Sequence, residues 1–158
     1  MTASTDLIES MWEEVDVCEV DTATLAFTDG RVAADHRGKD HLQWSDSWME
    51  LGTIGGYPCA AWWTGEDLSV PIEVQRDVEG SVIAVRAEVV NDIPDLDGVW
   101  NDVAELPFPT GQVFVCDPVC SSDRHWRALA VKPGIYQHQV FTYAGEPLGM
   151  RIIWLRAD

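Results

Sequence analysis

The amino-acid sequence predicts a mainly β protein, an antiparallel β-sandwich or barrel built from two similar β-units and preceded by one short N-terminal helix. Two observations carry this prediction. From residue 22, short runs of β-branched and aromatic residues bounded by Gly, Pro, Asp or Asn follow one another almost without helical patterns between them, which is typical of all-β domains. In addition, FTDGRVAAD (27–35) is similar to FPTGQVFVCD (108–117), which indicates an internal repeat.

The N-terminal helix is predicted over residues 5–16, TDLIESMWEEVD, within a first segment 1–20. Apolar residues from Leu7 to Val15 recur at i, i+1, i+4, i+5 and i+8, the spacing of one helix face. A second helix is possible over 95–106, although Gly98 weakens the helical pattern there.

The strands are predicted from short runs that alternate or are continuously apolar. These runs are TATLAF (22–27), GRVAAD (30–35), PCAAWW (58–63), SVPIEVQ (69–75), SVIAVRAEVV (81–90), GQVFVCD (111–117), WRALAV (126–131), IYQHQVFTY (135–143) and GMRIIWLRA (149–157).

The internal repeat is an ordered series of matches at nearly constant offset. Phe27 and Phe108, Gly30 and Gly111, and Val32 and Val113 are each 81 residues apart, and Asp35 and Asp117, and Trp44 and Trp126, are each 82 apart. In each copy a glycine permits a turn, a strand follows, and the aspartate at its end can bond backbone N–H groups of the next turn. We therefore expect one domain, 1–158, made of a first β-unit over 21–80 and a second over 81–158.

Composition and charge restrict the partners. The 158 residues are 46% hydrophobic with 8 tryptophans, as in a folded globular protein. The net charge is −17, from 27 acidic and 10 basic residues, which disfavours nucleic acid and anionic membranes and favours basic partners. A solvated surface that increases solubility is the alternative interpretation of this charge.

The N-terminus lacks the pattern of a secretory signal and no apolar run is long enough to cross a bilayer, so we expect a cytoplasmic protein with reduced cysteines.

The acidic residues concentrate in two stretches, 6–21 and 88–105, neither of which contains a basic residue. We expect these stretches to steer a cationic partner, with an aromatic side chain supplying the desolvated contact. The partner-binding residues predicted on this basis are Glu13, Glu14, Asp16, Asp92, Asp95 and Asp97, with Trp12 and Trp100 as the aromatic candidates.

Two clusters could carry chemistry instead. Cys116 and Cys120, with His125 and His138, could in principle form a tetrahedral zinc site. The spacing is irregular, however, and alternation along the strand places Cys116 with Phe114 as packing residues. The sequence therefore predicts neither a metal site nor a cofactor.

The second cluster is the basic patch HRGKDH (36–41), in which His36 and His41 each follow an aspartate and could perform acid–base catalysis. No nucleophile, zinc-protease or phosphate-loop motif accompanies it, so we expect a solvated loop and a protein without catalytic residues. A carbohydrate-binding face is another alternative, with a stacking platform drawn from Trp44, Trp48, Trp62, Trp63, Trp100 and Trp126.

Three segments carry a resemblance to known proteins. These are GQVFVCDP (111–118), KPGIY (132–136) and WSDSWMELG (44–52), about a third of the chain when their flanking strands are included. The chain resembles small bacterial β-sandwich proteins, and is similar to the competence-type nuclease inhibitor family. The resemblance implies an immunity protein or inhibitor that neutralises a nuclease or another basic toxin. The matching positions are turn residues, so the resemblance assigns no functional residue.

Overall fold

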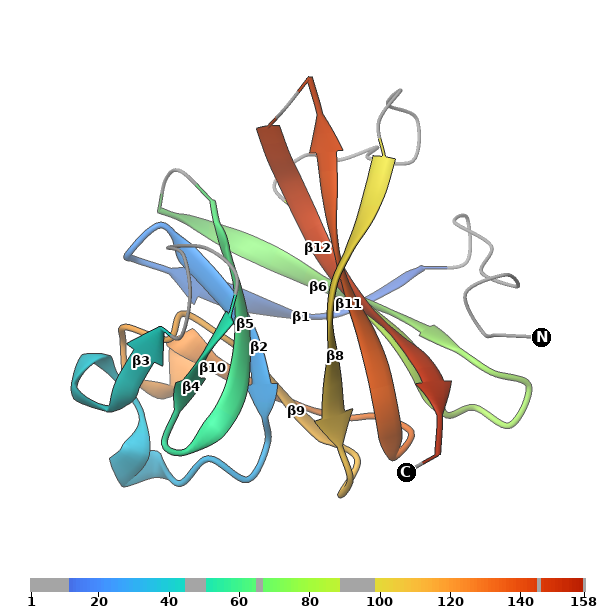
Figure 1. Cartoon of the computed structure of the whole chain (residues 1–158), viewed down its shortest axis with the longest axis horizontal. Coiled ribbons are helices and arrows are strands. Elements are labelled where there is room, and N and C mark those ends of the chain that lie inside the picture. Colours follow the sequence, from blue (N-terminus) through green and yellow to red (C-terminus); the bar gives the residue numbers. More distant parts are fainter. Residues whose placement is uncertain (1–11, 45–50, 65–66, 89–98, 145, 158) are drawn as a thin grey trace.

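Two antiparallel six-stranded sheets make up the computed structural model, which describes residues 12–44, 51–64, 67–88, 99–144 and 146–157 (Figure 1). The first sheet, sheet A, has the order β1-β6-β7-β12-β11-β8. Its strands are β1 (Glu13–Val20), β6 (Leu68–Arg76), β7 (Val82–Glu88), β8 (Val99–Phe108), β11 (Gly134–Tyr143) and β12 (Glu146–Arg156).

The second sheet, sheet B, has the order β10-β9-β2-β5-β4-β3. Its strands are β2 (Thr24–Asp29), β3 (Leu42–Trp44), β4 (Leu51–Ile54), β5 (Tyr57–Trp63), β9 (Gln112–Cys116) and β10 (Trp126–Ala130). Short 3-10 helices precede two of these strands, with η3 (Ala34–His36) and η4 (Lys39–His41) before β3 and η6 (Asp123–His125) before β10.

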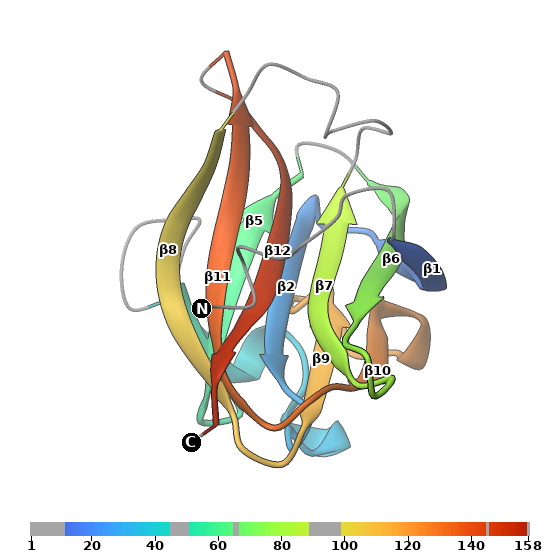
Figure 2. The same ribbon diagram turned by 90° about the vertical axis from the view of Figure 1, so that its right-hand side faces the viewer.

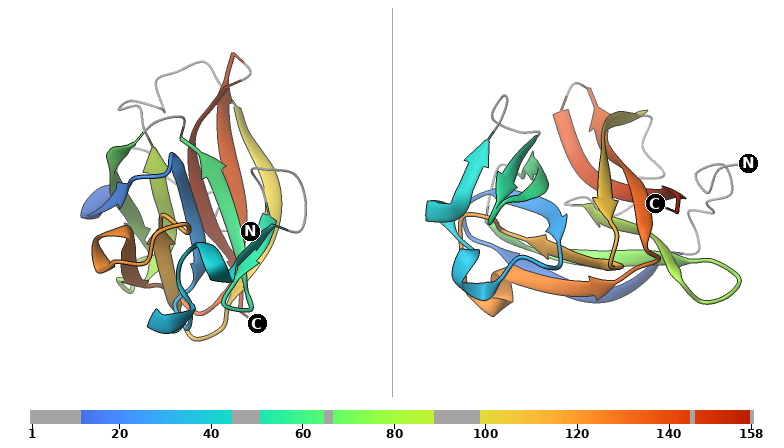
Figure 3. Two further views of the ribbon diagram at one scale, coloured as in Figure 1. Left: turned by 90° about the vertical axis from the view of Figure 1, so that its left-hand side faces the viewer. Right: turned by 60° about the horizontal axis from the view of Figure 1, so that its bottom comes forward.

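The main core lies between the facing sides of the two sheets (Figures 2 and 3). Sheet A contributes alternate residues such as Ile72 and Ile152, and sheet B contributes Phe27 and Trp62. Because side chains alternate along a strand, each run that places an apolar residue at every second position has one side facing this core. The predicted class, a mainly β protein of antiparallel sheets around a shared core, is confirmed.

A second, smaller cluster covers the opposite side of sheet B. Cys59, Phe114 and Cys116 pack there with Val32 and Trp126. Cys116 therefore points with Phe114, as alternation predicts, but away from the core between the sheets.

The predicted N-terminal helix is not confirmed, and over its last residues it is wrong. Glu13–Val20 forms the edge strand β1, paired with β6, while residues 1–11 lie outside the described residues. The run EEVDVCEV also alternates with period two, because Cys18 and Val20 enter the core and Val15 and Val17 remain exposed. Pairing with β6 bonds the backbone groups on one side of this run, and burial of alternate residues against the core favours a strand.

The prediction of a possible second helix over 95–106 is also wrong for residues 99–106, which the structure describes. Val99–Phe108 forms strand β8, paired with β11, and residues 89–98 lie outside the described residues. Leu106 and Phe108 alternate into the core, so burial again follows period two.

One predicted strand is absent. Residues 30–35, GRVAAD, form a turn followed by η3, and only Val32 of this run is buried. The other eight predicted runs overlap observed strands, whereas β3 and β4 were not predicted because LQW and LGTI are too short to show a period.

The two copies of the repeat consequently have different structures. Phe27 and Phe108 both lie in the main core. The glycine of the first copy leads into a turn and η3, however, whereas Gly111 leads into β9. Moreover, each sheet combines strands from 21–80 with strands from 81–158. The two predicted units are therefore not two separate layers.

Candidate functional site

The predicted acidic binding residues that are described, Glu13, Glu14 and Asp16, lie on β1, one edge strand of sheet A. On β1, Glu13 and Glu14 are exposed beside two exposed valines, Val15 at 38% and Val17 at 37%. Asp16 instead accepts a hydrogen bond from Arg127 Nε at 2.9 Å. This ion pair joins β1 to β10, so Asp16 ties the edge of one sheet to the edge of the other.

The second acidic stretch ends on β8, the opposite edge strand. Asp102 and Glu105 are exposed there, and Val99 is 60% exposed. The predicted residues Asp92, Asp95 and Asp97 lie outside the described residues. Five strand spacings of about 4.8 Å separate β1 from β8, or about 24 Å. The two acidic edges therefore do not form one patch, and a compact partner would contact one of them.

Trp12 and Trp100 both lie against arginines of sheet A. The guanidinium carbon of Arg86 is 4.4 Å from the ring centre of Trp12, and that of Arg151 is 4.0 Å from the ring centre of Trp100. Such cation–π contacts are strongest where the cation is shielded from water, and both arginines are buried. The two tryptophans thus have a structural role on this sheet.

The two arginines belong to a polar row that crosses sheet A from β6 to β8. Cross-strand register brings together Glu73, Arg86, Arg151, Gln139 and Asp102 in that order. Glu73 accepts from the guanidinium of Arg86 at 3.0 Å, and Gln139 joins Arg151 to Asp102 through two contacts of 2.7 Å. These contacts supply hydrogen-bond acceptors to the buried guanidinium groups of Arg86 and Arg151.

His36 and His41 are brought together, as the basic patch suggested. Their ring centres are 5.3 Å apart, and with Asp40, Gln43 and Thr53 they line an open hollow of about 320 Å³. Within the described residues, no group of three or more His, Cys, Asp or Glu side chains is placed to hold a metal ion.

The four residues of the possible zinc site lie apart. Cys116 is buried in the outer cluster of sheet B, and His138 is buried in sheet A facing Phe27. Burial raises the pKa of the Cys116 thiol well above its usual range, so this sulfur remains a protonated packing group.

Of the tryptophans considered for a carbohydrate platform, Trp48 and the side chains of Trp44 and Trp63 lie outside the described residues, while Trp62 and Trp126 are not available to a ligand. Trp62 is fully buried in the main core and Trp126 is buried against Phe114. Aromatic burial therefore accounts for both.

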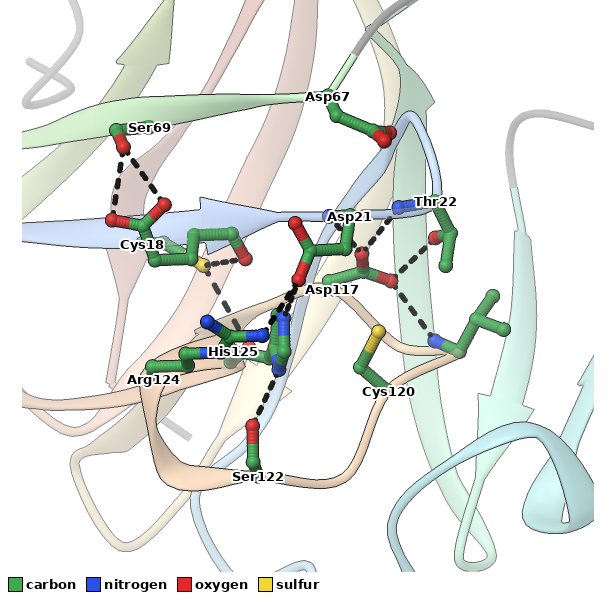
Figure 4. Close-up of polar contacts among 12 residues, drawn as sticks. Cys18, Asp21, Thr22, Asp67, Ser69, Asp117, Cys120, Ser122, Arg124 and His125 are labelled. Atoms are coloured by element: carbon green, nitrogen blue, oxygen red, sulfur yellow. Dashed lines mark hydrogen bonds and ion pairs between the residues drawn. The ribbon is translucent and has the colours of Figure 1, made fainter.

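A polar junction joins the β1–β2 turn to the loop between β9 and β10 (Figure 4). The carboxylate of Asp117, fully buried, accepts hydrogen bonds from the backbone N–H groups of Asp21 and Thr22 at 2.8 and 2.9 Å. It also accepts from the Thr22 hydroxyl at 2.6 Å and the Val119 N–H at 3.2 Å. The predicted bonding of Asp117 to the next turn is confirmed through Val119, whereas its matched residue Asp35 is exposed.

The junction positions one imidazole between a carboxylate and a hydroxyl. His125 Nε2 is 2.6 Å from Asp21 Oδ2, and His125 Nδ1 is 2.6 Å from Ser122 Oγ. Sequence reasoning considered His125 only as a metal ligand and missed Ser122. The Ser-x-x-His spacing in SSDRHW was a visible signal for this pair, but Asp21 lies 104 residues away in the sequence.

Comparisons of the chain with family models, with curated proteins and with solved structures find no match. Within the described residues, no helix is long and apolar enough to span a membrane.

Proposed function

We propose that this chain is a protein-binding module that neutralises a basic partner, such as a nuclease or another toxin, in the manner of an immunity protein or inhibitor. The observation that carries the proposal is the exposed edge of β1, where the exposed Glu13 and Glu14 precede the exposed Val15 in a chain of net charge −17. Carboxylates around an apolar contact favour fast encounter with a cationic surface and then desolvated binding.

The ion pairs of Asp16 and Glu13 determine which carboxylates of β1 could bind a partner. Asp16 is paired with Arg127, which offsets its charge and occupies its carboxylate. Within the described residues, Glu13 has a long contact of 3.5 Å with Arg76, between exposed groups, and surface pairs of this kind contribute little free energy. Glu13 can therefore exchange Arg76 for a cation of the partner at low cost.

The experiment begins with the product of the neighbouring reading frame, since inhibitors and toxins are often encoded together. We expect a stable complex with a basic nuclease or toxin, and loss of that protein's activity. Glu13→Lys/Glu14→Lys should lower the association rate about tenfold at low ionic strength, with a smaller effect at about 0.15 M salt.

The matched control is Asp35→Lys/Asp40→Lys, which makes the same change of charge at exposed residues outside sheet A. Equal effects of the two double variants would show that only net charge matters, and would contradict a binding surface at β1. Unchanged association in both would contradict electrostatic steering altogether.

A further inference from the structure

The Asp21–His125–Ser122 arrangement has the geometry that activates a hydroxyl group. A carboxylate orients one ring nitrogen of the imidazole and the hydroxyl lies at the other, both at 2.6 Å (Figure 4). The order of groups is that of an activated nucleophile, its base and the residue that orients the base. Here the hydroxyl contacts Nδ1 and the carboxylate contacts Nε2.

The charge of Asp21 determines which nitrogen carries the proton. The hydrogen bond from His125 lowers the pKa of Asp21, and Arg124 adds to the effect with a contact of 3.1 Å to the same oxygen. An ionised carboxylate can only accept, so in the neutral imidazole the proton is on Nε2. The lone pair then lies on Nδ1, facing the Ser122 hydroxyl.

The loop holds Ser122 in this position without using its hydroxyl elsewhere. Ser122 is the N-cap residue of η6, yet its side chain makes no capping hydrogen bond. The loop is instead fixed by its backbone, since Ser122 O accepts from His125 N–H at 3.0 Å and Cys120 O accepts from Trp126 Nε1 at 2.7 Å. Ser122 is exposed to solvent while His125 is buried, so a reagent can reach the hydroxyl but the base is shielded.

We propose that Ser122 is a reactive nucleophile that accepts an acyl group from an activated ester. The Ser122 Oγ–acyl carbon bond forms, the ester C–O bond breaks, and the hydroxyl proton passes to His125 Nδ1 and then to the departing alkoxide or phenolate. Asp21 is a positioning residue that stabilises the transient imidazolium. This site goes beyond the proposed binding function, and it requires one covalent addition and no turnover.

The test uses p-nitrophenyl acetate on the full chain, with acetylated residues located by peptide mass spectrometry. Ser121 is an adjacent exposed serine without a histidine contact within the described residues, and so serves as an internal control. General-base assistance predicts that Ser122 is acetylated about 10²-fold faster than Ser121. Ser122→Ala should remove the rapid release of p-nitrophenolate, and Ser121→Ala should leave it unchanged. Equal rates at the two serines would overturn the proposal.

The role of the imidazole needs its own measurement. Nitrogen NMR of His125 should show the proton of the neutral ring on Nε2, and a neutral ring protonated at Nδ1 would overturn the proposal because no lone pair would face Ser122. Asp21→Asn, with its fold verified by circular dichroism, should reduce the Ser122-to-Ser121 ratio at least tenfold, about 1.4 kcal/mol. A ratio unchanged in this variant would equally count against the mechanism.

Discussion

At the scale of single residues, His138 is the most unusual group in the core. It lies on β11, an interior strand next to the edge strand β8, with its ring 5.9 Å from that of Phe27. Both ring nitrogens are buried and have no hydrogen-bond partner within the described residues. Burial lowers the pKa of His138 from 6.5 to about 3, because a charged imidazole in this core would lose its hydration without compensation.

The neutral state of His138 makes the fold sensitive to acid. Below pH 6.5 the unfolded chain binds a proton at this residue, whereas the folded chain binds one only near pH 3, so stability is lost as pH falls between these values. Linkage predicts a loss of about 2 kcal/mol from this residue between pH 7 and pH 5. His138→Leu should remove that loss, since leucine has no proton to bind.

The measurement is urea denaturation of both proteins at the two pH values. His36, His41 and His125 remain in both, so the difference between the two pH dependences isolates His138. Leucine also removes two unbonded buried nitrogens, so the variant should be at least as stable at pH 7. Parallel pH dependences of the two proteins would show that His138 becomes charged in the folded state.

At the scale of elements, the junction between the β1–β2 turn and the β9–β10 loop connects the two sheets. Asp117 supplies acceptors to three backbone N–H groups and one hydroxyl across this junction. His125 strengthens the same connection, because its Nε2 is 2.6 Å from Asp21 Oδ2 in the β1–β2 turn. Asp117 thus performs for two loops what a capping residue does for a helix end.

Replacing the two matched aspartates of the repeat tests whether the same local sequence pattern contributes equally to stability in both copies. Asp117→Ala leaves buried donors without acceptors, and we expect a loss of about 3 kcal/mol in the free energy of unfolding. Asp35→Ala alters an exposed side chain at the matched position and should change stability by less than about 0.5 kcal/mol. Equal losses in thermal or urea denaturation would mean that the two copies are structurally equivalent after all.

The edge strands of sheet A show a second property at this scale. β1 and β8 each present carboxylates beside exposed valines, and charges on an edge strand oppose pairing with a second molecule. These carboxylates therefore disfavour edge-to-edge pairing of two copies of the chain.

At the scale of the whole molecule, the net charge of −17 should make stability depend on salt. Many charges of one sign repel in the compact state, and raising the ionic strength from about 0.01 M to about 0.15 M shortens the screening length from about 30 Å to about 8 Å. Surface pairs such as Arg124–Asp21 weaken too, but each contributes little.

We therefore expect the melting temperature to rise over this range of sodium chloride concentration. A recovery of about 1 kcal/mol corresponds to about 3 °C for a domain of this size. Scanning calorimetry at constant pH measures the shift. A lower melting temperature in salt would mean that favourable ion pairs, including the polar row of sheet A, outweigh the repulsion.

Strand-forming runs could be recognised from the sequence wherever alternation was long enough to show its period. SVPIEVQ and GMRIIWLRA both overlap observed strands because their alternate residues face the core. The prediction failed at GRVAAD, where a single apolar residue of a turn was read as part of a strand, and at 13–16, where a helical period upstream was extended too far. In both places the periodic signal covered fewer residues than the segment assigned to it.

Some features of the candidate sites could likewise be predicted from the sequence, and others depend on the tertiary structure. The acidity of 6–21 and 88–105 is a property of composition, and the sequence contains it in full. That β1 and β8 are opposite edges of one sheet depends on strand order, which local residues do not encode. The contact of Asp21 with His125 likewise depends on a turn and a loop that Asp117 joins.

The sequence by itself thus determined the β class, most strands, the negative charge and the role of Cys116 as a packing residue, because each follows from residues within a few positions of one another. The tertiary structure alone decided which matched aspartate is buried, which carboxylates are held by arginines, and which serine faces a histidine. Those outcomes depend on contacts between segments as much as 111 residues apart, and only the order of strands in the two sheets brings such segments together.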